Sequence, residues 1–281
     1  WKAPKYVHTA QLMKMDGGSK RKLSKRKDPE LALDFYNAEG YPVPSVLEYL
    51  MTLLNSNFED WRLANPTAPM GDFQFTTKKM GNSGSLFDID KLKDVSKNTI
   101  SVMSADQVYD EVTAWAKDFD PQLYTLLTAD EQKAKAIFAI GRGGAKPRKD
   151  IAIWSEVKDY VAFFYEELFT AASEYPENVS TQDARDILTQ YRSLYSPADD
   201  GETWFNKVRE LGESLGFAAK PKDYKKNPDQ YKGHVGDVSQ VIRLAITGRT
   251  NSPDLCSVMQ ILGEEVCQQR LAQAIELLSN R

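Results

Sequence analysis

The amino-acid sequence predicts a mainly α-helical protein with short strands only near its beginning. Beyond residue 43, apolar side chains recur at helical spacing, as in Val46, Leu50 and Leu54. Several of these apolar stripes follow a Ser or Thr that could cap a helix. The joins between stripes are short, which is typical of helical bundles. Together these observations favour a helical bundle for most of the chain.

The first predicted element is a short strand over residues 6–13, where apolar and polar residues partly alternate and β-forming residues occur. A polar and basic loop is expected to follow, over residues 16–28. Pro44 and Ser45 then open the first clear helical stripe. Residues 65–85 contain several prolines and glycines, and they predict an irregular hinge between domains.

Helix starts can be predicted further along the chain. Capping boxes are predicted at Ser104, Thr128 and Ser180, because each hydroxyl can accept from an orphan backbone N–H of the following turn. A stripe of apolar residues from Val157 to Leu168 predicts a helix between the last two of these caps.

The final third of the sequence also has helix boundaries. Ser252 followed by Pro253 predicts a helix start, and Gly263 predicts a helix end. The stripes assigned to helices in this part are Trp204, Val208, Leu211 and Leu215; Val238, Val241, Ile242 and Ala245; and Cys267, Leu271, Ala274, Ile275 and Leu278.

Composition and charge exclude several classes of protein. The 281 residues include 36 basic and 40 acidic ones, so binding to nucleic acid would need local basic patches. Cys256 and Cys267 cannot form a disulfide scaffold, and their apolar surroundings predict reduced core residues. No apolar run approaches the ~18 residues of a membrane span, so we expect a cytoplasmic protein without membrane contact. The chain begins at Trp1 rather than methionine, which suggests a piece of a longer protein.

The basic loop is the sharpest chemical feature of the sequence. Six lysines and arginines lie between Lys20 and Lys27, after two glycines and between a predicted strand and a predicted helix. One interpretation is a solvated linker. The other is a loop that closes over a polyphosphate and supplies point charges to it.

The segment Lys22–Arg26 resembles the KMSKS signature of class I aminoacyl-tRNA synthetases, in its KLSKR form. Three other stretches are similar to glutamate–tRNA ligases and occur in that family's order. They are residues 5–8 ahead of the loop, residues 84–92, and residues 243–263 near the end. The resemblance therefore covers essentially the whole chain.

The resemblance implies a division into three domains. Residues 1–70 would form the KLSKR loop and a stem-contact region with short strands. Residues 71–172 and 173–281 would form two helical-bundle anticodon-binding domains. The parent enzyme would activate glutamate with ATP, in a Mg-dependent reaction, and transfer it to tRNA(Glu). By the same resemblance we expect a monomer.

In that family the signature loop holds the ATP phosphates and stabilises charge as pyrophosphate leaves. Lys25 matches the second lysine of the signature, which acts directly on the ATP phosphates. Lys22 and Ser24 match the residues that shape and support the loop, and Arg26 matches the arginine of the KLSKR form. Common bacterial members continue with His-Gly, whereas Lys27–Glu30 follows here, which leaves the subfamily open.

A second basic loop, residues 141–149, joins two predicted helices. It is not a Walker A loop, because no Gly-Lys-Ser/Thr follows at the required spacing. The resemblance favours contact of Arg142 and Arg148 with RNA phosphates, but a solvated turn between helices also explains them. The lysines within residues 220–232 have the same two explanations.

Arg243, Ser252, Pro253 and Leu255 match family positions that line the surface reading the anticodon. Unstacked bases need a guanidinium, a hydroxyl or backbone group, and an apolar platform, and these residues could supply them. The alternative is structural: Ser252 and Pro253 would start a helix, and Leu255 would belong to the core.

The ATP-binding half of a class I enzyme is not evident in the sequence. Its HIGH signature needs two histidines three apart, whereas the 2 histidines here are His8 and His234. No alternation of strands and helices typical of a parallel sheet occurs either. We therefore expect the chain alone to be inactive and to bind no cofactor or metal. Two alternatives are a glutamine–tRNA ligase, whose anticodon domains are β-barrels, and a non-catalytic tRNA-binding or scaffold module.

Overall fold

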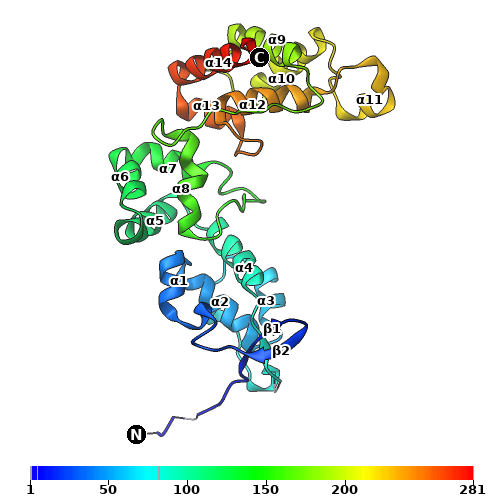
Figure 1. The fold of residues 1–281 in the computed structure, drawn as a ribbon. Coiled ribbons are helices and arrows are strands. Elements are labelled where there is room, and N and C mark those ends of the chain that lie inside the picture. Colours follow the sequence, from blue (N-terminus) through cyan, green and yellow to red (C-terminus); the bar gives the residue numbers. More distant parts are fainter. Residues whose placement is uncertain (1, 5, 82, 281) are drawn as a thin grey trace. The chain divides into compact units, whose positions relative to one another are not determined.

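A computed structural model of the chain describes residues 2–4, 6–81 and 83–280 (Figure 1). It confirms the predicted fold class, because the described residues are mainly α-helical and contain a small three-stranded sheet. The chain divides into two compact units, unit 1 over Trp1–Tyr160 and unit 2 over Val161–Arg281. The three-domain division with boundaries at 70 and 172 stays a prediction.

Unit 1 begins with a sheet of strand order β2-β1-β3. Strands β1 (Leu12–Asp16) and β2 (Ser19–Lys22) are antiparallel and are joined by Gly17 and Gly18, with φ of 54° and 86°. Glycine adopts these left-handed conformations without steric cost, and two-residue hairpin turns favour them. Strand β3 (Ser85–Leu86) pairs with β1 in parallel.

The strand predicted over residues 6–13 is wrong in its position. Residues 6–11 form no strand, and β1 starts at Leu12 and continues into the predicted loop over residues 16–28. The first half of that loop is therefore a hairpin, because the two glycines allow the chain to reverse at once. Lys5, at the start of the stretch that resembles the family, lies outside the described residues.

Helices make up most of the rest of unit 1. In chain order they are η1 (Pro29–Leu31), α1 (Leu33–Glu39), α2 (Val43–Leu54), α3 (Phe58–Ala64), η2 (Met70–Asp72), η3 (Thr77–Lys79), α4 (Ile89–Ser101), α5 (Ala105–Phe119), α6 (Pro121–Ala129), α7 (Glu131–Ala139), η4 (Trp154–Glu156) and α8 (Val157–Val161), which ends beside the boundary. Helix α2 confirms the stripe predicted from Pro44. Of the predicted irregular segment, residues 65–81, 83 and 84 contain two short 3-10 turns and no α-helix, which confirms its irregularity, whereas Ser85 belongs to β3. Its role as a hinge between domains stays a prediction.

Two of the predicted capping boxes differ in outcome within unit 1. Ser104 caps α5, with Gln107 reaching back to its backbone N–H, so this prediction is confirmed. The box at Thr128 is wrong, because Asp130 caps α7 by accepting from Lys133 N–H at 2.9 Å. Thr128 still belongs to α6, where its hydroxyl donates to the carbonyl of Tyr124. The carboxylate of Asp130, two residues later, therefore caps the helix in place of the Thr128 hydroxyl.

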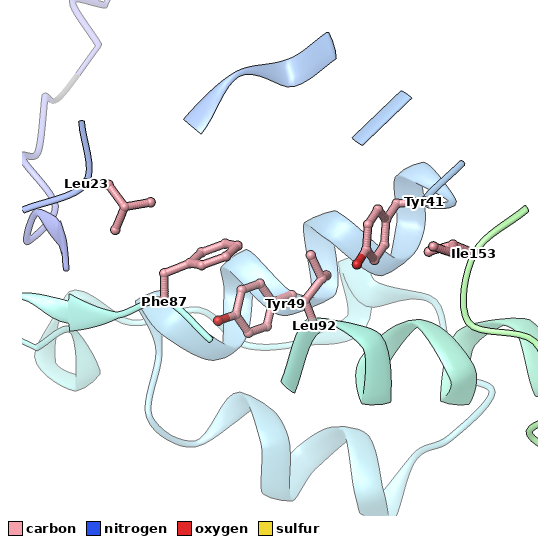
Figure 2. Close-up of a cluster of buried hydrophobic side chains, with 6 residues drawn as sticks. All are labelled: Leu23, Tyr41, Tyr49, Phe87, Leu92 and Ile153. Carbon is pink, nitrogen blue, oxygen red and sulfur yellow. The ribbon is translucent and has the colours of Figure 1, made fainter. Parts of the chain in front are cut away.

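One apolar cluster joins the sheet to the helices of unit 1 (Figure 2). Its buried residues are Leu23, Tyr41, Tyr49, Phe87, Leu92 and Ile153. The Tyr49 hydroxyl accepts from the backbone N–H of Asp88 at 2.6 Å, and Asp88 caps α4. The family-like stretch over residues 84–92 is therefore part of this core and of the start of α4.

The helix predicted from Val157 to Leu168 is shorter than expected. Helix α8 ends at Val161, the 3-10 turn η5 (Ala162–Phe164) follows, and Tyr165 is extended. The carbonyl of Phe163 accepts from the Arg270 guanidinium at 2.8 Å instead of from a later N–H of its own segment. A tertiary hydrogen bond has replaced a helical one.

Unit 2 is a bundle of helices in which α9 packs against α12 and α14, and α10 packs against α12 (Figure 1). The helices are α9 (Thr181–Leu194), α10 (Gly201–Ser214), α11 (Pro221–Lys226), the 3-10 turn η6 (Pro228–Gln230), α12 (Val235–Thr247), α13 (Leu255–Leu262) and α14 (Glu264–Ser279). The apolar stripes predicted for this part lie on α10, α12 and α14, which confirms them, except that Leu215 is the C-cap that follows α10. Ser180 caps α9, as predicted, by accepting from the Asp183 N–H. The return bond of the predicted capping box is replaced, because the Asp183 carboxylate accepts from the Ser180 hydroxyl.

Helix α13 begins later than the sequence predicts. Its cap is Asp254, which accepts from Ser257 N–H at 2.8 Å, so the prediction of Ser252 as the cap is wrong. Gly263 ends α13 with φ of 82°, as predicted. Cys256 and Cys267 are buried free thiols, which confirms their assignment to the core. Among the described residues, no helix is both long enough and apolar enough to span a membrane.

Candidate functional site

The KLSKR segment, Lys22–Arg26, begins at the end of β2, and the position of its first residues is fixed. The Leu23 side chain is 4% exposed and belongs to the core cluster of Figure 2. Its backbone N–H donates to the carbonyl of Leu12 in β1 at 3.1 Å. Burial of this one apolar side chain therefore anchors the start of the loop on the core.

A tight turn over Ser24–Asp28 forms the rest of the loop. The backbone N–H groups of Lys27 and Asp28 donate to the Ser24 carbonyl at 3.0 and 2.9 Å. In return, the Asp28 carboxylate accepts from the Ser24 backbone N–H at 2.7 Å. The Asp28 residue is only 2% exposed, so the loop is closed at its far end by a buried carboxylate.

Arg21 in β2 is the charge partner of that carboxylate. Its Nη1 and Nη2 donate to the two Asp28 oxygens at 2.7 and 2.8 Å, which is the bidentate geometry of a strong pair. Arg21 Nε donates to Asp16 at 2.6 Å. The Arg21 hydrogen bond, helped by the Ser24 N–H, holds the pKa of Asp28 well below its usual range.

A second buried carboxylate follows directly. Glu30 is 7% exposed and forms an ion pair with Lys14 of β1. Lys14 also lies 3.8 Å from Asp28. The hydrogen bond with Glu30 raises the pKa of Lys14. Two cations of the hairpin, Lys14 and Arg21, thus form ion pairs with the carboxylates at the end of the loop.

The remaining cations of the loop are open to solvent. Lys22, Lys25, Arg26 and Lys27 are exposed, and none of them forms an ion pair within the part of the chain that the structure describes. Ser24 is half-buried, and its hydroxyl accepts from Arg26 N–H at 3.4 Å. Exposed cations on a loop held at both ends can receive an anionic group without first breaking an internal pair.

Arg142, predicted to contact RNA, is used inside the protein. Its Nε donates to the Phe138 carbonyl and its Nη1 to the Ile100 carbonyl, both at 2.6 Å. These carbonyls lie in the last turns of α7 and α4, where the usual helical partners four residues later are missing. The Ile100 carbonyl also accepts from the Met103 N–H at 3.2 Å. The guanidinium therefore joins the C-terminal ends of two helices. Contact of Arg142 with RNA stays a prediction.

Arg148, the other arginine predicted in this loop, lies on the surface. Its guanidinium donates two hydrogen bonds to Asp150, at 2.6 and 2.9 Å, and its backbone N–H donates to the carbonyl of Gly141. An exposed pair of this kind contributes little to stability, so a phosphate could compete for the guanidinium.

The predicted anticodon-reading residues do come together at the loop between α12 and α13. Arg243 of α12 is half-buried, and its Nη1 donates to the carbonyls of Ser252 and Pro253 and to the Ser252 hydroxyl. Ser252 and Pro253 are buried, and Leu255 is 1% exposed. Of the four, Arg243 is the one whose side chain reaches solvent.

The lysines within residues 220–232 surround the short helix α11. Lys220, Lys222, Lys225 and Lys226 are exposed, whereas Lys232 forms an ion pair with Asp183 at 2.5 Å. Neither explanation of these lysines, RNA contact or a charged surface loop, is decided by this arrangement.

Sequence reasoning missed the roles of Asp28 and Arg21. Both were visible in the sequence, Asp28 as the residue that departs from the family's His-Gly and Arg21 as one of many basic residues of the loop. The signal that was available is the two-glycine hairpin, because its register pairs Arg21 with Lys14, and these are the two cations that lie beside Asp28.

The fold of the chain is that of known anticodon-binding proteins. The family described as the anticodon binding domain matches residues 107–275, which is more than half of the chain. In fold, the chain is similar to the glutamate-tRNA synthetase of Elizabethkingia anophelis, with a TM-score of 0.64 at 18% identity. The match covers 98% of this chain and 52% of that one, and it concerns the fold alone.

Curated relatives are much closer in sequence. The glutamate–tRNA ligase of Acetivibrio thermocellus is 48% identical over 275 residues, covering 98% of this chain and 50% of the relative. That of Clostridium beijerinckii is 46% identical over 282 residues, covering 99% of this chain and 51% of the relative. The chain thus belongs to the anticodon-binding-domain family, and over nearly its whole length it is similar to about half of each of these glutamate–tRNA ligases. It spans about half the length of the curated relatives it matches.

Proposed function

We propose that the full-length protein activates glutamate with ATP and transfers it to tRNA(Glu), and that this chain supplies the phosphate loop and the tRNA-binding helices. The observation that carries the proposal is the loop Lys22–Arg26. It is anchored by Leu23 at its start and by Asp28 at its end, and Lys25 and Arg26 are exposed and form no ion pair with any residue that the structure describes. A module that only binds RNA has no need of such a loop.

The chemistry asked of the loop is electrostatic. In the activation step a carboxylate oxygen of glutamate attacks the α-phosphorus of ATP, the bond from that phosphorus to the bridging oxygen breaks, and pyrophosphate leaves. Magnesium is expected to accompany ATP. Lys25 and Arg26 would stabilise the charge that develops on the departing pyrophosphate. Lys22 and Ser24 would shape the loop around it.

The helical part would hold tRNA(Glu). We assign Arg243 to the surface that reads the anticodon, with Ser252, Pro253 and Leu255 forming the layer beneath it, because these three are buried and Arg243 is not. Guanidinium groups both stack on unstacked bases and donate hydrogen bonds to them. Arg148 would contact the phosphate backbone by exchanging Asp150 for a phosphate.

Besides its predicted contact with RNA, Arg142 would act indirectly on RNA binding. Its guanidinium holds the ends of α4 and α7, so it positions the loop over residues 141–149 that carries Arg148. We also expect the full-length protein to act as a cytoplasmic monomer.

The alternative of a non-catalytic tRNA-binding module is not favoured, because the relatives named above are ligases. The test uses the full-length protein, purified with and without this half. Glutamate-dependent ATP–pyrophosphate exchange and charging of tRNA(Glu) are expected for the full-length protein only. An inactive full-length protein that still binds tRNA(Glu) would support the module instead.

A further inference from the structure

Asp28 occupies an unusual position for an acidic residue. It directly follows three exposed cations, Lys25, Arg26 and Lys27, in a loop that is proposed to receive phosphate. An exposed carboxylate there would compete with phosphate for the same cations. Yet the Asp28 residue is 2% exposed, and its oxygens are directed into the protein, at Arg21 and at the Ser24 N–H.

We propose that Asp28 is a positioning residue of the KLSKR loop, which fixes the Ser24–Asp28 turn so that Lys25 and Arg26 are presented to phosphate. This inference rests on the proposed function of the loop. It assigns no contact with substrate to Asp28, which acts through the loop cations.

The contacts of Asp28 explain how one carboxylate can hold the turn. One oxygen, Oδ2, accepts from both the Ser24 N–H and Arg21 Nη1, so the loop backbone and strand β2 share an acceptor. The other oxygen, Oδ1, accepts from Arg21 Nη2 at 2.8 Å. Loss of the carboxylate would leave the Ser24 N–H and Arg21 Nη2 without this acceptor, although Arg21 Nε would keep its hydrogen bond to Asp16.

Charge also favours this assignment. Lys22, Lys25, Arg26 and Lys27 are like charges within a few residues, and they repel one another when no anion is bound. Asp28 places a negative charge at the end of the same turn. Because its carboxylate is paired with Arg21, it does not pair with any of these four exposed cations. The loop can thus be held before phosphate arrives, which is the condition for preorganised electrostatic stabilisation.

The structure provides a matched control. Asp16 also accepts from Arg21, at 2.6 Å, but its side chain is 59% exposed and forms no ion pair with the described residues of the loop. Substitution of Asp16 removes a carboxylate from the same arginine and leaves the Ser24–Asp28 turn intact.

The experiment measures ATP–pyrophosphate exchange by the full-length protein. We expect Asp28→Ala to lower kcat by about 10- to 100-fold, the loss typical of a misplaced catalytic group, and Asp28→Asn, which keeps an acceptor oxygen, by about 3- to 10-fold. Asp16→Asn should stay within about 2-fold of wild type. Affinity for tRNA(Glu) should be unchanged in all three.

A second arm separates positioning from general damage. In a Lys25→Ala background, Asp28→Ala should lower the rate by a smaller factor than it does in the wild type, because the part of its effect that acts through Lys25 is already lost. In this chain alone, hydrogen exchange at the Ser24 amide should be faster in Asp28→Ala and Asp28→Asn but not in Asp16→Asn, with exchange in α4 unchanged.

The outcomes distinguish a failure of the positioning role of Asp28 from a failure of the proposed function. If wild-type protein catalyses exchange and Asp28→Ala does so at the same rate, the positioning role is wrong. Equal loss from Asp28→Ala with and without Lys25 would also overturn it, as would an unchanged Ser24 amide. If the wild-type full-length protein shows no glutamate-dependent exchange, it is the proposed function that fails.

Discussion

Arg243 in α12 donates a hydrogen bond from Nη1 to the carbonyl oxygen of Pro253, 3.1 Å away, across the loop that leads into α13. The same nitrogen also reaches the carbonyl and hydroxyl of Ser252. The residue proposed to read the anticodon therefore also braces the loop that carries its neighbours. A substitution at Arg243 must be judged on both roles.

Arg243→Ala is expected to destabilise unit 2 by about 1–3 kcal/mol, because three acceptors in a half-buried loop lose their donor. It should also weaken preference for the cognate anticodon by about 1–3 kcal/mol. Urea unfolding measures the first effect, and binding of tRNA(Glu) and of an anticodon-swapped variant measures the second.

The two roles of Arg243 can be separated with Arg243→Lys. A lysine can keep one hydrogen bond to the loop but has no planar guanidinium for a base. We expect most of the stability to return and the anticodon preference to stay weak. Full return of the preference would show that Arg243 acts only through the loop.

Arg142→Ala should lower the free energy of unfolding of unit 1 by about 1–3 kcal/mol, since the carbonyls of Ile100 and Phe138 lose a buried partner. Lys146→Ala, in the same loop but exposed, is the control and should change stability by less than about 0.5 kcal/mol. Chemical denaturation of the two variants tests this. Equal stabilities would mean that the guanidinium does not hold the helix ends.

Lys25→Ala in the full-length protein should reduce transition-state stabilisation in glutamate activation by about 2–4 kcal/mol, with a much smaller effect on tRNA affinity. The reason is that Lys25 is an exposed cation without an internal partner among the described residues, so its charge is available to phosphate. Pyrophosphate exchange gives the rate, and Lys20→Ala in the hairpin serves as the control. An exchange rate equal to that of wild type would rule out a phosphate role for Lys25.

This chain alone should bind tRNA(Glu), with an affinity that falls steeply as salt rises. Arg148→Ala should weaken binding to all tRNAs alike and reduce the salt slope by about one unit. Asp150→Asn removes the carboxylate that now holds Arg148, so it should leave binding equal or stronger. Titrations at several salt concentrations test both variants, and a salt slope unaffected by Arg148→Ala would remove this residue from the interface.

The two thiols should resist alkylation in the folded chain. Burial raises the pKa of Cys267 to about 11 and raises that of Cys256 as well. Because the thiolate is the reactive form, both should react with iodoacetamide at pH 8 at least about 10-fold more slowly than in denaturant. The folded state keeps the Cys267 proton above the pH where an unfolded thiol loses it, so stability should fall between about pH 9 and 11. Equal alkylation rates in the folded and unfolded chain would contradict this.

The sequence by itself determined the helical class, most helix positions and the family. These follow from apolar spacing, from caps a few residues away and from motifs such as Lys22–Arg26, all of which are local in the chain. The local signals failed where a nearby competitor was stronger, as when Asp130 took the cap expected at Thr128. The hairpin was also missed, although its Gly-Gly turn is a local signal.

Only the tertiary structure decided which polar groups are free to act. Arg142 and Arg148 look alike in the sequence, yet the first is bound to a carbonyl 42 residues away and the second lies on the surface. Arg270 ends the helix predicted to Leu168 by bonding to Phe163, 107 residues away. Hydrogen-bond partners this distant are chosen by how the helices pack, and a buried donor must find one. The spacing of apolar side chains along the sequence does not indicate which distant partner is used.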